Sequence, residues 1–268
     1  MTLEVRILGC GSSGGVPRLG EGAPCWGACN PENPKNRRLR CSILVTARGL
    51  HGETRLLVDT SPDMREQLLV AKIGRLDAVL ITHDHADQLH GMDDLRVITL
   101  NMRRRLDLWS DRRGLDGVML KFAYCFQTPP GSDYPPILNA REIPEPFAPF
   151  DLTGAGGPVP VLAFGQRHGR IRSLGYRFGP VAYSPDVDGL GEAAFAALEG
   201  VECWIVDALR YTPHPSHAHL AQTLDWIERV KPKRAILTNM HVDLDYERLK
   251  RELPPGVEPA YDGMVLSF

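Results

Sequence analysis

Hydrophobic and polar residues alternate in the first strand-like segment of the chain, residues 3–8, and a glycine- and serine-rich run follows at 9–15. Alternation with a period of two predicts a β-strand with one buried face, and the permissive run predicts a loop. Shorter apolar segments at 41–45 and 55–58 predict buried strands. Another apolar segment, residues 77–81, predicts a strand that ends directly before a histidine-rich stretch.

A helix is predicted to follow the third of these strands. Ser61 suits the N-cap position and Pro62 the first helical position, because proline has the φ angle of a helix and its missing N–H costs nothing there. The apolar residues Met64, Leu68 and Leu69 then recur at helical spacing.

The second half of the chain returns to short elements in a regular order. Strands are predicted at 160–164, 173–178, 181–183, 203–206 and 235–237, and helices at 191–198, 218–230 and 246–252; the apolar residues 264–266 close the chain. Strands dominate the start of each half and helices follow, which favours two sheets with helices outside them. We therefore expect the α/β (α+β) class. Since no Ser/Gly linker or short repeat divides the chain, we expect a single domain over residues 1–268.

The segment 101–160 differs in character from the rest. Arg103 to Arg105 supply positive charge, and nine prolines fall between Pro129 and Pro160. We expect a helix followed by a long irregular excursion in this segment. Loops of that length are usually functional, so we expect the excursion to cover the pocket.

The composition argues against several classes of protein, namely nucleic-acid-binding, disulfide-rich and membrane-spanning proteins. Lys and Arg number 31 against 33 Asp and Glu, so the net charge of −2 gives no sign of nucleic acid or an anionic membrane as the main partner. Six cysteines in 268 residues are too sparse for a disulfide scaffold. No run of about 18 apolar residues occurs, and Glu4 and Arg6 interrupt the segment where a signal peptide would be apolar. We expect a cytoplasmic protein with reduced thiols.

Three of the nine histidines lie within eight residues, directly after the strand predicted at 77–81. His83, His85 and Asp87 form a His-x-His-x-Asp pattern, in which alternate side chains of an extended segment point the same way. Imidazole together with carboxylate suits Zn²⁺, Mn²⁺ or Fe²⁺, and histidine is the commonest metal ligand. We therefore predict a metal site at the end of this strand.

Several further motifs occur in the same order as in a known family. Besides Thr82 to Asp87, the matching segments are Gly9 to Pro17, Asn36 to Arg38, Leu57 to Asp59, Tyr183 to Asp186, Ser216 to His217, Leu237 to Thr238 and Tyr261 to Met264. On these motifs the chain resembles the metallo-β-lactamase fold superfamily of metallohydrolases over nearly its whole length. The set is most similar to the branch of phosphoribosyl 1,2-cyclic phosphate phosphodiesterases, and more distantly to tRNA 3′-processing endonucleases.

This resemblance implies a four-layered αββα sandwich with metal ions at one edge of the two sheets. It also implies that one divalent ion, Mn²⁺ or Zn²⁺, is held by four residues, namely His83, His85, His168 and Asp186. Asp59 matches the aspartate that orients the metal-binding loop without ligating the ion.

The ligands of a second ion depart from the family pattern. Related enzymes carry histidines at the positions of Gln88 and Asn239, and both amides are poor ligands. A histidine lies two residues downstream of each position, at His90 and His241. Either the enzyme uses one ion only, or displaced ligands complete a second site, which we favour. That second site would consist of His90, His241, Asp87 and Asp186.

The resemblance also implies a reaction. A bound divalent ion lowers the pKa of its water from about 15.7 toward about 7 and so produces hydroxide at neutral pH. In the resembling phosphodiesterases a histidine that matches His217 protonates the leaving oxygen, and Asp87 joins it among the catalytic residues. His214 and His219 compete for the role of proton donor. The sequence places the first in an exposed loop between two prolines and the second at a helix start.

Cys25 and Cys29 resemble part of a structural zinc loop in the same branch. Those relatives use three close cysteines and a distant histidine, whereas this chain has two cysteines there and Val242 at the position of the histidine. A closed structural zinc site has four ligands, so we expect two free thiols.

The expected function is a metal-dependent hydrolase that cleaves a small phosphodiester, either a cyclic phosphate or a nucleotide. The net charge disfavours the nearest alternative, an RNA-processing nuclease of the same fold, because affinity for nucleic acid rests on phosphate neutralisation. Hydrolysis of a thioester or a β-lactam is a third candidate, and a metal-binding cofactor-biosynthesis protein without hydrolytic activity is a fourth. No membrane partner is expected, and the oligomeric state is left open, with a homodimer as one alternative.

Overall fold

The computed structural model of the chain describes residues 2–268 and divides into two compact units. Within the described residues, the first unit comprises residues 2–8, 42–159 and 265–268, and the second comprises residues 9–41 and 160–264. Each unit carries strands and helices.

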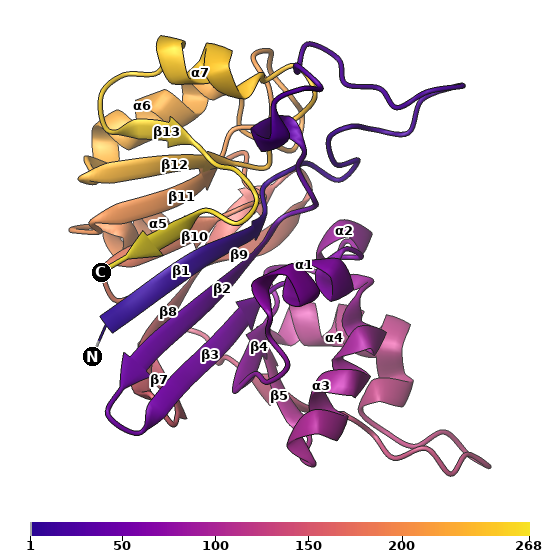
Figure 1. Cartoon of the computed structure of the whole chain (residues 1–268). Coiled ribbons are helices and arrows are strands. Elements are labelled where there is room, and N and C mark those ends of the chain that lie inside the picture. Colours follow the sequence, from indigo (N-terminus) through magenta and orange to yellow (C-terminus); the bar gives the residue numbers. More distant parts are fainter. Residues whose placement is uncertain (1) are drawn as a thin grey trace. The chain divides into compact units, whose positions relative to one another are not determined.

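The first unit is built on a seven-stranded sheet with the order β14-β1-β2-β3-β4-β5-β6 (Figure 1). Its strands are β1 (Thr2–Gly9), β2 (Ser42–Gly49), β3 (Gly52–Val58), β4 (Ala78–Leu80), β5 (Leu106–Ser110), β6 (Leu138–Glu142) and β14 (Val265–Ser267). Its helices are α1 (Met64–Ala71), α2 (Ala86–Leu89), α3 (Leu95–Met102) and α4 (Arg112–Phe122), with the 3-10 turns η2 (Met92–Asp94) and η3 (Ala123–Cys125).

The central strands of this sheet place the histidine motif at one edge. β3, β4, β5 and β6 run parallel, so their carboxyl ends lie on the same side of the sheet. β4 is buried at all three positions, as expected for an interior strand of a parallel sheet. Thr82 and His83 follow β4 closely, and α2 begins three residues later. The predicted metal motif therefore lies at the carboxyl edge of the sheet.

The start of the first helix corrects one sequence expectation. The helix α1 begins at Met64 and not at Pro62, and its N-cap residue Asp63 makes no side-chain cap bond. The Ser61 hydroxyl accepts a hydrogen bond from the Asp63 N–H (3.2 Å) and donates one to Gln67 Oε1 (3.1 Å). Ser61 thus holds the turn that precedes the helix, because its hydroxyl is engaged there and not in a cap.

The segment 101–160 corrects a second expectation, since it contains four complete regular elements where we expected a helix and an irregular excursion. These elements are β5, α4, β6 and β7 (Phe150–Gly154). Irregular structure is limited mainly to residues 126–137 and 143–149, which hold most of the prolines. β6 exposes most of its residues, and such a strand lacks the apolar run by which a buried strand is recognised in a sequence.

The second unit contains most of a sheet with the order β13-β12-β11-β10-β9-β8-β7. Besides β7, the strands are β8 (Gly157–His168), β9 (Ile171–Phe178), β10 (Val181–Ser184), β11 (Cys203–Asp207), β12 (Arg234–Thr238) and β13 (Val257–Pro259). The helices are α5 (Glu192–Leu198), α6 (Leu220–Val230) and α7 (Tyr246–Glu252), with the 3-10 turn η1 (Pro34–Asn36).

Four strands of this sheet end at the same edge. β8 and β10 are both antiparallel to β9, and β10, β11 and β12 are parallel to one another. His168 and Asp207 are the last residues of β8 and β11, while Asp186 and Asn239 follow β10 and β12. The topology therefore gathers four polar side chains from distant parts of the sequence at one sheet edge.

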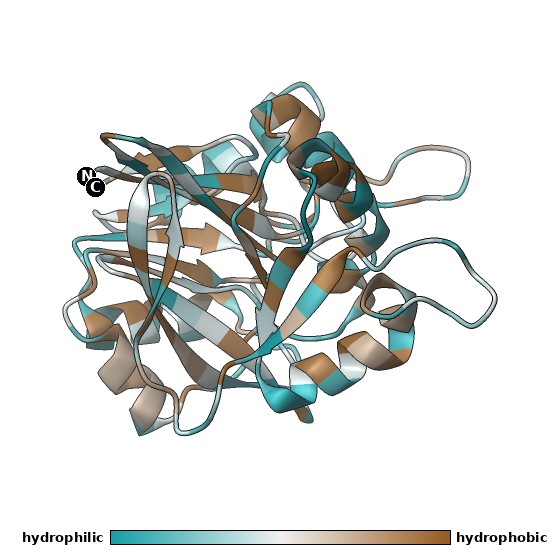
Figure 2. Ribbon diagram, turned by 90° about the horizontal axis from the view of Figure 1, so that it is seen from below, coloured by the Kyte–Doolittle hydropathy of each residue, from teal (hydrophilic) through white to brown (hydrophobic). Residues whose placement is uncertain are grey.

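Hydrophobic residues are concentrated in the strands of both units. Figure 2 shows brown, hydrophobic positions along the strands and a mixture of brown and teal positions on the helices. In α4, for example, Leu115 and Val118 are buried while Arg112 is exposed. Within residues 2–268, every helix is too short or too polar to span a bilayer.

Candidate metal site

His83 is oriented by a chain of hydrogen bonds that begins at Asp59. The Thr82 hydroxyl lies 2.9 Å from Asp59 Oδ2 and 3.1 Å from His83 Nδ1. A hydroxyl has one proton, so Thr82 donates it to the carboxylate and accepts from the His83 Nδ1–H. The Thr82 amide also donates to Asp59 Oδ1 at 2.8 Å. This arrangement places the lone pair of His83 on Nε2, as in imidazoles that bind a metal and are held through Nδ1.

Asp59 occupies an unusual position after β3. Its side chain is completely buried, and burial raises the pKa of the carboxyl well above its ordinary value, although the hydrogen bonds from Thr82 act in the opposite direction. Its backbone has a φ of 66°, in the left-handed region that residues other than glycine rarely adopt. Such a backbone persists only where the surrounding structure over-determines it. These contacts support the predicted role of Asp59 as the residue that orients the loop of His83.

The other residues of the motif surround the start of α2. The rings of His83 and His85 lie edge to face, with 4.5 Å between their centroids. His85 is exposed and Asp87 is half-buried, so both are accessible from solvent. Gln88 is completely buried, and its side-chain nitrogen lies 3.4 Å from Asp87 Oδ2. The first unit therefore presents two imidazoles and a carboxylate close together in the chain.

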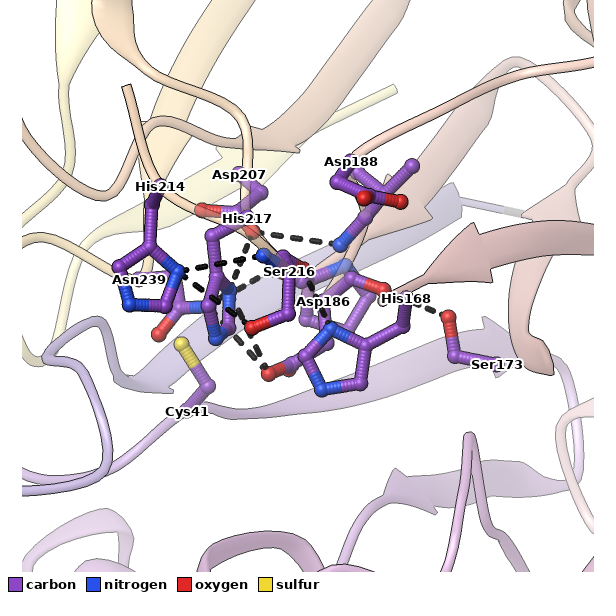
Figure 3. A network of polar contacts seen from close by, with 12 residues as sticks. Cys41, His168, Ser173, Asp186, Asp188, Asp207, His214, Ser216, His217 and Asn239 are labelled. Carbon is purple, nitrogen blue, oxygen red and sulfur yellow. Dashed lines mark hydrogen bonds and ion pairs between the residues drawn. The ribbon is translucent and has the colours of Figure 1, made fainter. Parts of the chain in front are cut away.

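Three side chains of the second unit form a compact group of potential ligands. One ligand atom each from His168, Asp186 and His217 lies within 4.8 Å of the other two, and Figure 3 shows the three side chains side by side. His168 and Asp186 are buried, and His217 is half-buried. A mixed set of imidazoles and a carboxylate suits Zn²⁺, Mn²⁺ or Fe²⁺, so this group fits a divalent metal ion.

His168 is held in one tautomer by the backbone of a neighbouring loop. Its Nδ1 lies 2.6 Å from the carbonyl oxygen of Ser216. A carbonyl can only accept, so Nδ1 carries the proton and Nε2 carries the lone pair. His83 and His168 thus show the same arrangement, in which Nδ1 is engaged with the protein and Nε2 has the electron pair that a metal needs.

His217 lies beside a carboxylate and an amide. Its Nδ1 lies 2.8 Å from Asp207 Oδ2 and 3.1 Å from Asn239 Nδ2 (Figure 3). Asn239 Nδ2 also lies 3.0 Å from the carbonyl oxygen of Pro185, which identifies this atom as the amide nitrogen. Of these two neighbours only the Asp207 carboxylate can accept a hydrogen bond, so we assign the Nδ1 proton of His217 to Asp207.

Asp207 is completely buried, and burial raises the pKa of its carboxyl to about 6. The neighbouring His217 and the Val187 N–H, 3.2 Å from Oδ2, act to lower that pKa. Above about pH 6 the carboxylate is ionised and favours the protonated form of His217. A second carboxylate oxygen, Asp186 Oδ1, lies 3.8 Å from His217 Nδ1. An imidazolium at this position therefore faces two negative charges.

The two histidines that compete with His217 lack a carboxylate within ion-pair distance in residues 2–268. His214 Nδ1 accepts a hydrogen bond from the Ser216 N–H (3.3 Å), and its ring centroid lies 5.1 Å from that of His217. Burial, followed by the charge of His217, lowers the pKa of His214. His214 is therefore half-buried beside His217 and is not the exposed loop residue that we expected. His219 is the N-cap residue of α6 and makes no side-chain cap bond.

The two histidines expected as displaced ligands make other contacts. In the second unit, His241 Nδ1 lies 2.9 Å from Asp243 Oδ1, and its Nε2 lies 2.8 Å from Nη1 of Arg18. A guanidinium only donates, so it engages the lone pair of Nε2. In the first unit, the exposed His90 lies edge to face against Phe122, with 5.6 Å between ring centroids. The ligand roles of His90 and His241 stay predictions.

The loop of Cys25 and Cys29 packs around a buried arginine. Arg38 is 1% exposed, and its guanidinium donates to the carbonyl oxygen of Leu244 at 2.7 Å and lies 3.9 Å from Cys29 Sγ. Val242 belongs to the same apolar cluster as Cys29. A fixed guanidinium therefore cross-links this loop to the segment before α7.

Asp207 and Ser216 are candidate functional residues that the sequence analysis missed. Asp207 ends the apolar strand β11, and Asp59, which was identified by its match to a family motif, likewise follows the buried strand β3. A carboxylate at the end of a buried strand is a signal that could have found Asp207. Ser216 acts through its backbone carbonyl, which no pattern of residue types reveals.

The Beta-lactamase superfamily domain matches residues 54–240 of the chain. The chain belongs to the β-lactamase superfamily. Among solved structures, a diphosphatase from the PhnP family has 31% sequence identity and a TM-score of 0.88, and the similarity covers 100% of this chain and 98% of that one. The α/β class and the metallo-β-lactamase fold predicted from the sequence motifs are thereby confirmed.

Two further similar proteins have other names. Zinc-bound PqqB from Methylobacterium extorquens has a TM-score of 0.73 at 18% identity, over 98% of this chain and 99% of that one, which shows a shared fold alone. An octanoyltransferase from Porphyromonas gingivalis is 34% identical over 265 residues, covering 96% of this chain and 50% of the relative. The chain therefore spans about half the length of that relative. The superfamily fold implies hydrolytic chemistry and divalent metal ions, and both histidine groups described above have the chemistry to bind them.

Proposed function

We propose that this superfamily member is a metal-dependent phosphodiesterase in which His217 is the general acid. The observation that carries the proposal is the pairing of His217 with the buried Asp207, beside His168 and Asp186. Histidine is the side chain most often used for proton transfer in enzymes. A carboxylate on Nδ1 fixes its orientation and leaves Nε2 as the atom that transfers the proton.

We propose that one divalent ion is held by the four residues that the sequence singled out, His83, His85, His168 and Asp186. Three imidazoles and one carboxylate suit Mn²⁺ and Zn²⁺. The tautomers fit as well, because Nδ1 is engaged with the protein in both His83 and His168. When bound, such an ion supplies Lewis-acid activation of water near neutral pH.

The side chains of the second unit supply the proton for the leaving group. An alkoxide is a poor leaving group at neutral pH, so a phosphodiesterase gains rate by protonating it in the transition state. His217 provides this proton from Nε2. Asp207 keeps the Nδ1 proton in place and stabilises the charged ring, and Asp186 Oδ1 adds a second negative charge 3.8 Å from Nδ1.

The contacts of Asn239 support one ion over two. Asn239 is 1% exposed, and its amide nitrogen lies 3.0 Å from the Pro185 carbonyl oxygen and 3.4 Å from Asp186 Oδ1. An amide nitrogen donates hydrogen bonds and has no electron pair for a metal. The Asn239 amide nitrogen, a hydrogen-bond donor, thus lies where the family pattern has a ligand of the second ion. His241, the other expected ligand, is hydrogen-bonded to Arg18 and Asp243.

The proposed substrate is a small molecule with a phosphodiester or diphosphate bond, such as a cyclic phosphate or a nucleotide. The similarity to a PhnP-family diphosphatase, which spans the whole of this chain, supports this class. Hydrolysis of either bond needs an activated water and gains rate when the leaving oxygen is protonated, so the same residues can serve both. The net charge of −2 supports a small substrate over a polynucleotide.

A second candidate function is a role in cofactor biosynthesis, including hydrolysis of an acyl thioester. It is favoured by the octanoyltransferase relative, which matches 96% of this chain, and by the shared fold with PqqB. A thiolate leaves without protonation more readily than an alkoxide, so this reaction would depend less on His217.

The test measures hydrolysis of a panel of substrates by the metal-free protein, before and after Mn²⁺ or Zn²⁺ is added back. The panel contains a bis-aryl phosphodiester, a cyclic ribose phosphate, a 2′,3′-cyclic nucleotide, a nucleoside diphosphate and an octanoyl thioester. We expect metal-dependent turnover of at least one phosphate substrate and none of the thioester. Turnover of the thioester alone would select the second candidate, and no turnover with either metal would contradict a hydrolase.

A further inference from the structure

The first unit contains a basic pocket that the proposed reaction does not use. It lies between α3, the start of β5 and the loop that precedes β6, and it has a volume of about 360 Å³. That volume is at the lower end of the range for small-ligand sites. The residues that matter for its chemistry are Arg96, Leu100, Arg103, Arg104, Arg105 and Tyr134.

This pocket and the histidine motif lie at opposite edges of one sheet. β4 and β5 are parallel neighbours, with Leu80 opposite Trp109. His83 lies just beyond the carboxyl end of β4, whereas Arg105 directly precedes the amino end of β5. Figure 1 shows α3 beside the amino end of β5. A ligand in the pocket would therefore not be in contact with His83.

Two of the four arginines are left without a neutralising partner. Arg96 pairs with Asp93 at 3.2 Å, and Arg104 pairs with Asp77 at 3.4 Å. Within residues 2–268, neither Arg103 nor Arg105 has a carboxylate within ion-pair distance. Two uncompensated guanidinium groups at one pocket attract an anion, and their planar donor pattern matches phosphate.

The same pocket offers a flat apolar surface. The Tyr134 side chain is 73% exposed, and the Arg96 guanidinium lies 5.9 Å from its ring centroid. The backbone of Tyr134 is held in place, since its N–H donates to Ser132 Oγ at 3.2 Å and its carbonyl accepts from Thr128 Oγ1 at 3.1 Å. An exposed aromatic ring on a fixed backbone is suited to stack against the ring of a ligand.

We propose that this pocket binds a mononucleotide, with the phosphate on Arg103 and Arg105 and the base on Tyr134. A free phosphate or a dicarboxylate would leave the aromatic and apolar surface unused, and a neutral apolar ligand would leave both charges uncompensated. Leu100, which is 68% exposed, widens the apolar surface available to the base. The proposal is independent of the reaction at the histidines.

The experiment is calorimetric titration of AMP into protein kept metal-free with EDTA, so that metal-dependent nucleotide binding does not contribute. We expect one AMP per chain, and at least tenfold weaker binding for the double variant Arg103→Ala, Arg105→Ala. Tyr134→Ala should weaken the binding of AMP but not that of ribose 5-phosphate, which has no base. All these side chains lie at the surface, so the variants should fold, which circular dichroism verifies.

The matched control is Arg113→Ala, which removes an exposed arginine of α4 outside the pocket. It should bind AMP as the unmodified protein does. Failure of AMP to bind, or equal affinity in the double variant, would overturn the proposal. Tighter binding of a single-stranded RNA oligomer than of AMP, with a steep dependence on salt, would replace it with a nucleic-acid surface.

Discussion

The Nδ1 atom of His217 lies 2.8 Å from a carboxylate oxygen of Asp207, and the Asp207 side chain is completely buried. Burial disfavours a charged carboxylate, and here it raises the pKa of Asp207 to about 6. The hydrogen bond from His217 acts against that effect. At neutral pH the Asp207 carboxylate is therefore ionised and accepts from His217 Nδ1, which directs the proton-transfer atom Nε2 away from Asp207.

Replacement of Asp207 should slow the chemical step while leaving the metal in place. In Asp207→Asn the amide oxygen can still accept from Nδ1, but the negative charge that stabilises the protonated ring is lost. We expect kcat to fall by about 10²–10⁴-fold, the range for loss of general acid catalysis. Steady-state kinetics together with metal analysis check this. The control is Asp188→Asn, which alters an aspartate paired with the exposed Arg167; loss of metal from Asp207→Asn would contradict the assigned role.

The pH dependence of the reaction should report the same carboxyl. Because the pKa of Asp207 is raised to about 6, the carboxylate becomes protonated as the pH falls through that value and stops accepting from His217. We expect kcat to decline on the acidic side of about pH 6. When kcat is measured between pH 5 and 8, the decline below about pH 6 should be absent from Asp207→Asn. An unchanged decline in this variant would show that another group causes it.

Asp262 should make the stability of the protein depend on pH. Burial raises the pKa of its carboxyl to about 7, against about 3.9 for an unfolded aspartate, although the Leu39 N–H (2.7 Å) and the Cys10 N–H (3.1 Å) act to lower it. The folded state thus binds the carboxyl proton of Asp262 more tightly than the unfolded state does. Its contribution to stability is present below about pH 4 and is lost as the pH rises through about 7.

The size of this effect is on the order of a few kcal/mol, at about 1.4 kcal/mol per pKa unit. Urea unfolding of the metal-free protein at pH 5 and pH 8 measures it. The free energy of unfolding should fall more with rising pH in the unmodified protein than in Asp262→Asn, whose absolute stability is lower because its amide cannot accept both N–H groups. Equal pH dependence in the two proteins would show that Asp262 does not hold the proton.

Thr82 should control metal affinity without touching the ion. Its hydroxyl links Asp59 to His83 Nδ1, so Thr82→Val removes the acceptor that fixes the His83 tautomer. Loss of such a supporting contact weakens metal binding by about 10–100-fold. Competition with a chromogenic chelator measures the affinity. The control Thr99→Val, which alters a buried threonine of α3, should leave the metal affinity unchanged. Equal metal affinities in the two variants would show that the contact from Thr82 to His83 does not support metal binding.

The number of bound metal ions should depend on Gln88 and Asn239, the two amides at positions where related enzymes have histidines. We expect one equivalent of metal in the unmodified protein and two in the double variant Gln88→His, Asn239→His. His90→Ala and His241→Ala should keep the single equivalent. Two equivalents in the unmodified protein, with one lost in either alanine variant, would instead support the displaced ligands.

Much of the fold could be predicted because its strands are buried. The apolar runs at 55–58 and 181–183 and the alternation at 3–8 appear in the structure as β3, β10 and β1. β6 went unrecognised because most of its residues are exposed, and β7 because Leu152 alone among its residues is buried; prolines also surround both strands. The start of α1 was misplaced because Ser61 and Pro62 form a turn that uses the residue types of a helix cap.

The candidate site was predictable where the chemistry is concentrated in one segment. The motif from His83 to Asp87 stands out because three potential ligands follow a buried strand. The link between His217 and Asp207 could not be predicted, because it depends on β11 ending beside the loop of His217, a contact set by sheet order. The engagement of His241 with Arg18 likewise joins residues more than two hundred positions apart.

The most direct test of the proposed metal centre is the metal content of three single variants, measured by mass spectrometry after dialysis. We predict one equivalent in the unmodified protein, none above background in either His83→Ala or His168→Ala, and one equivalent in His217→Ala. Retention of the ion in both of the first two variants, or loss of it from His217→Ala, would contradict the account.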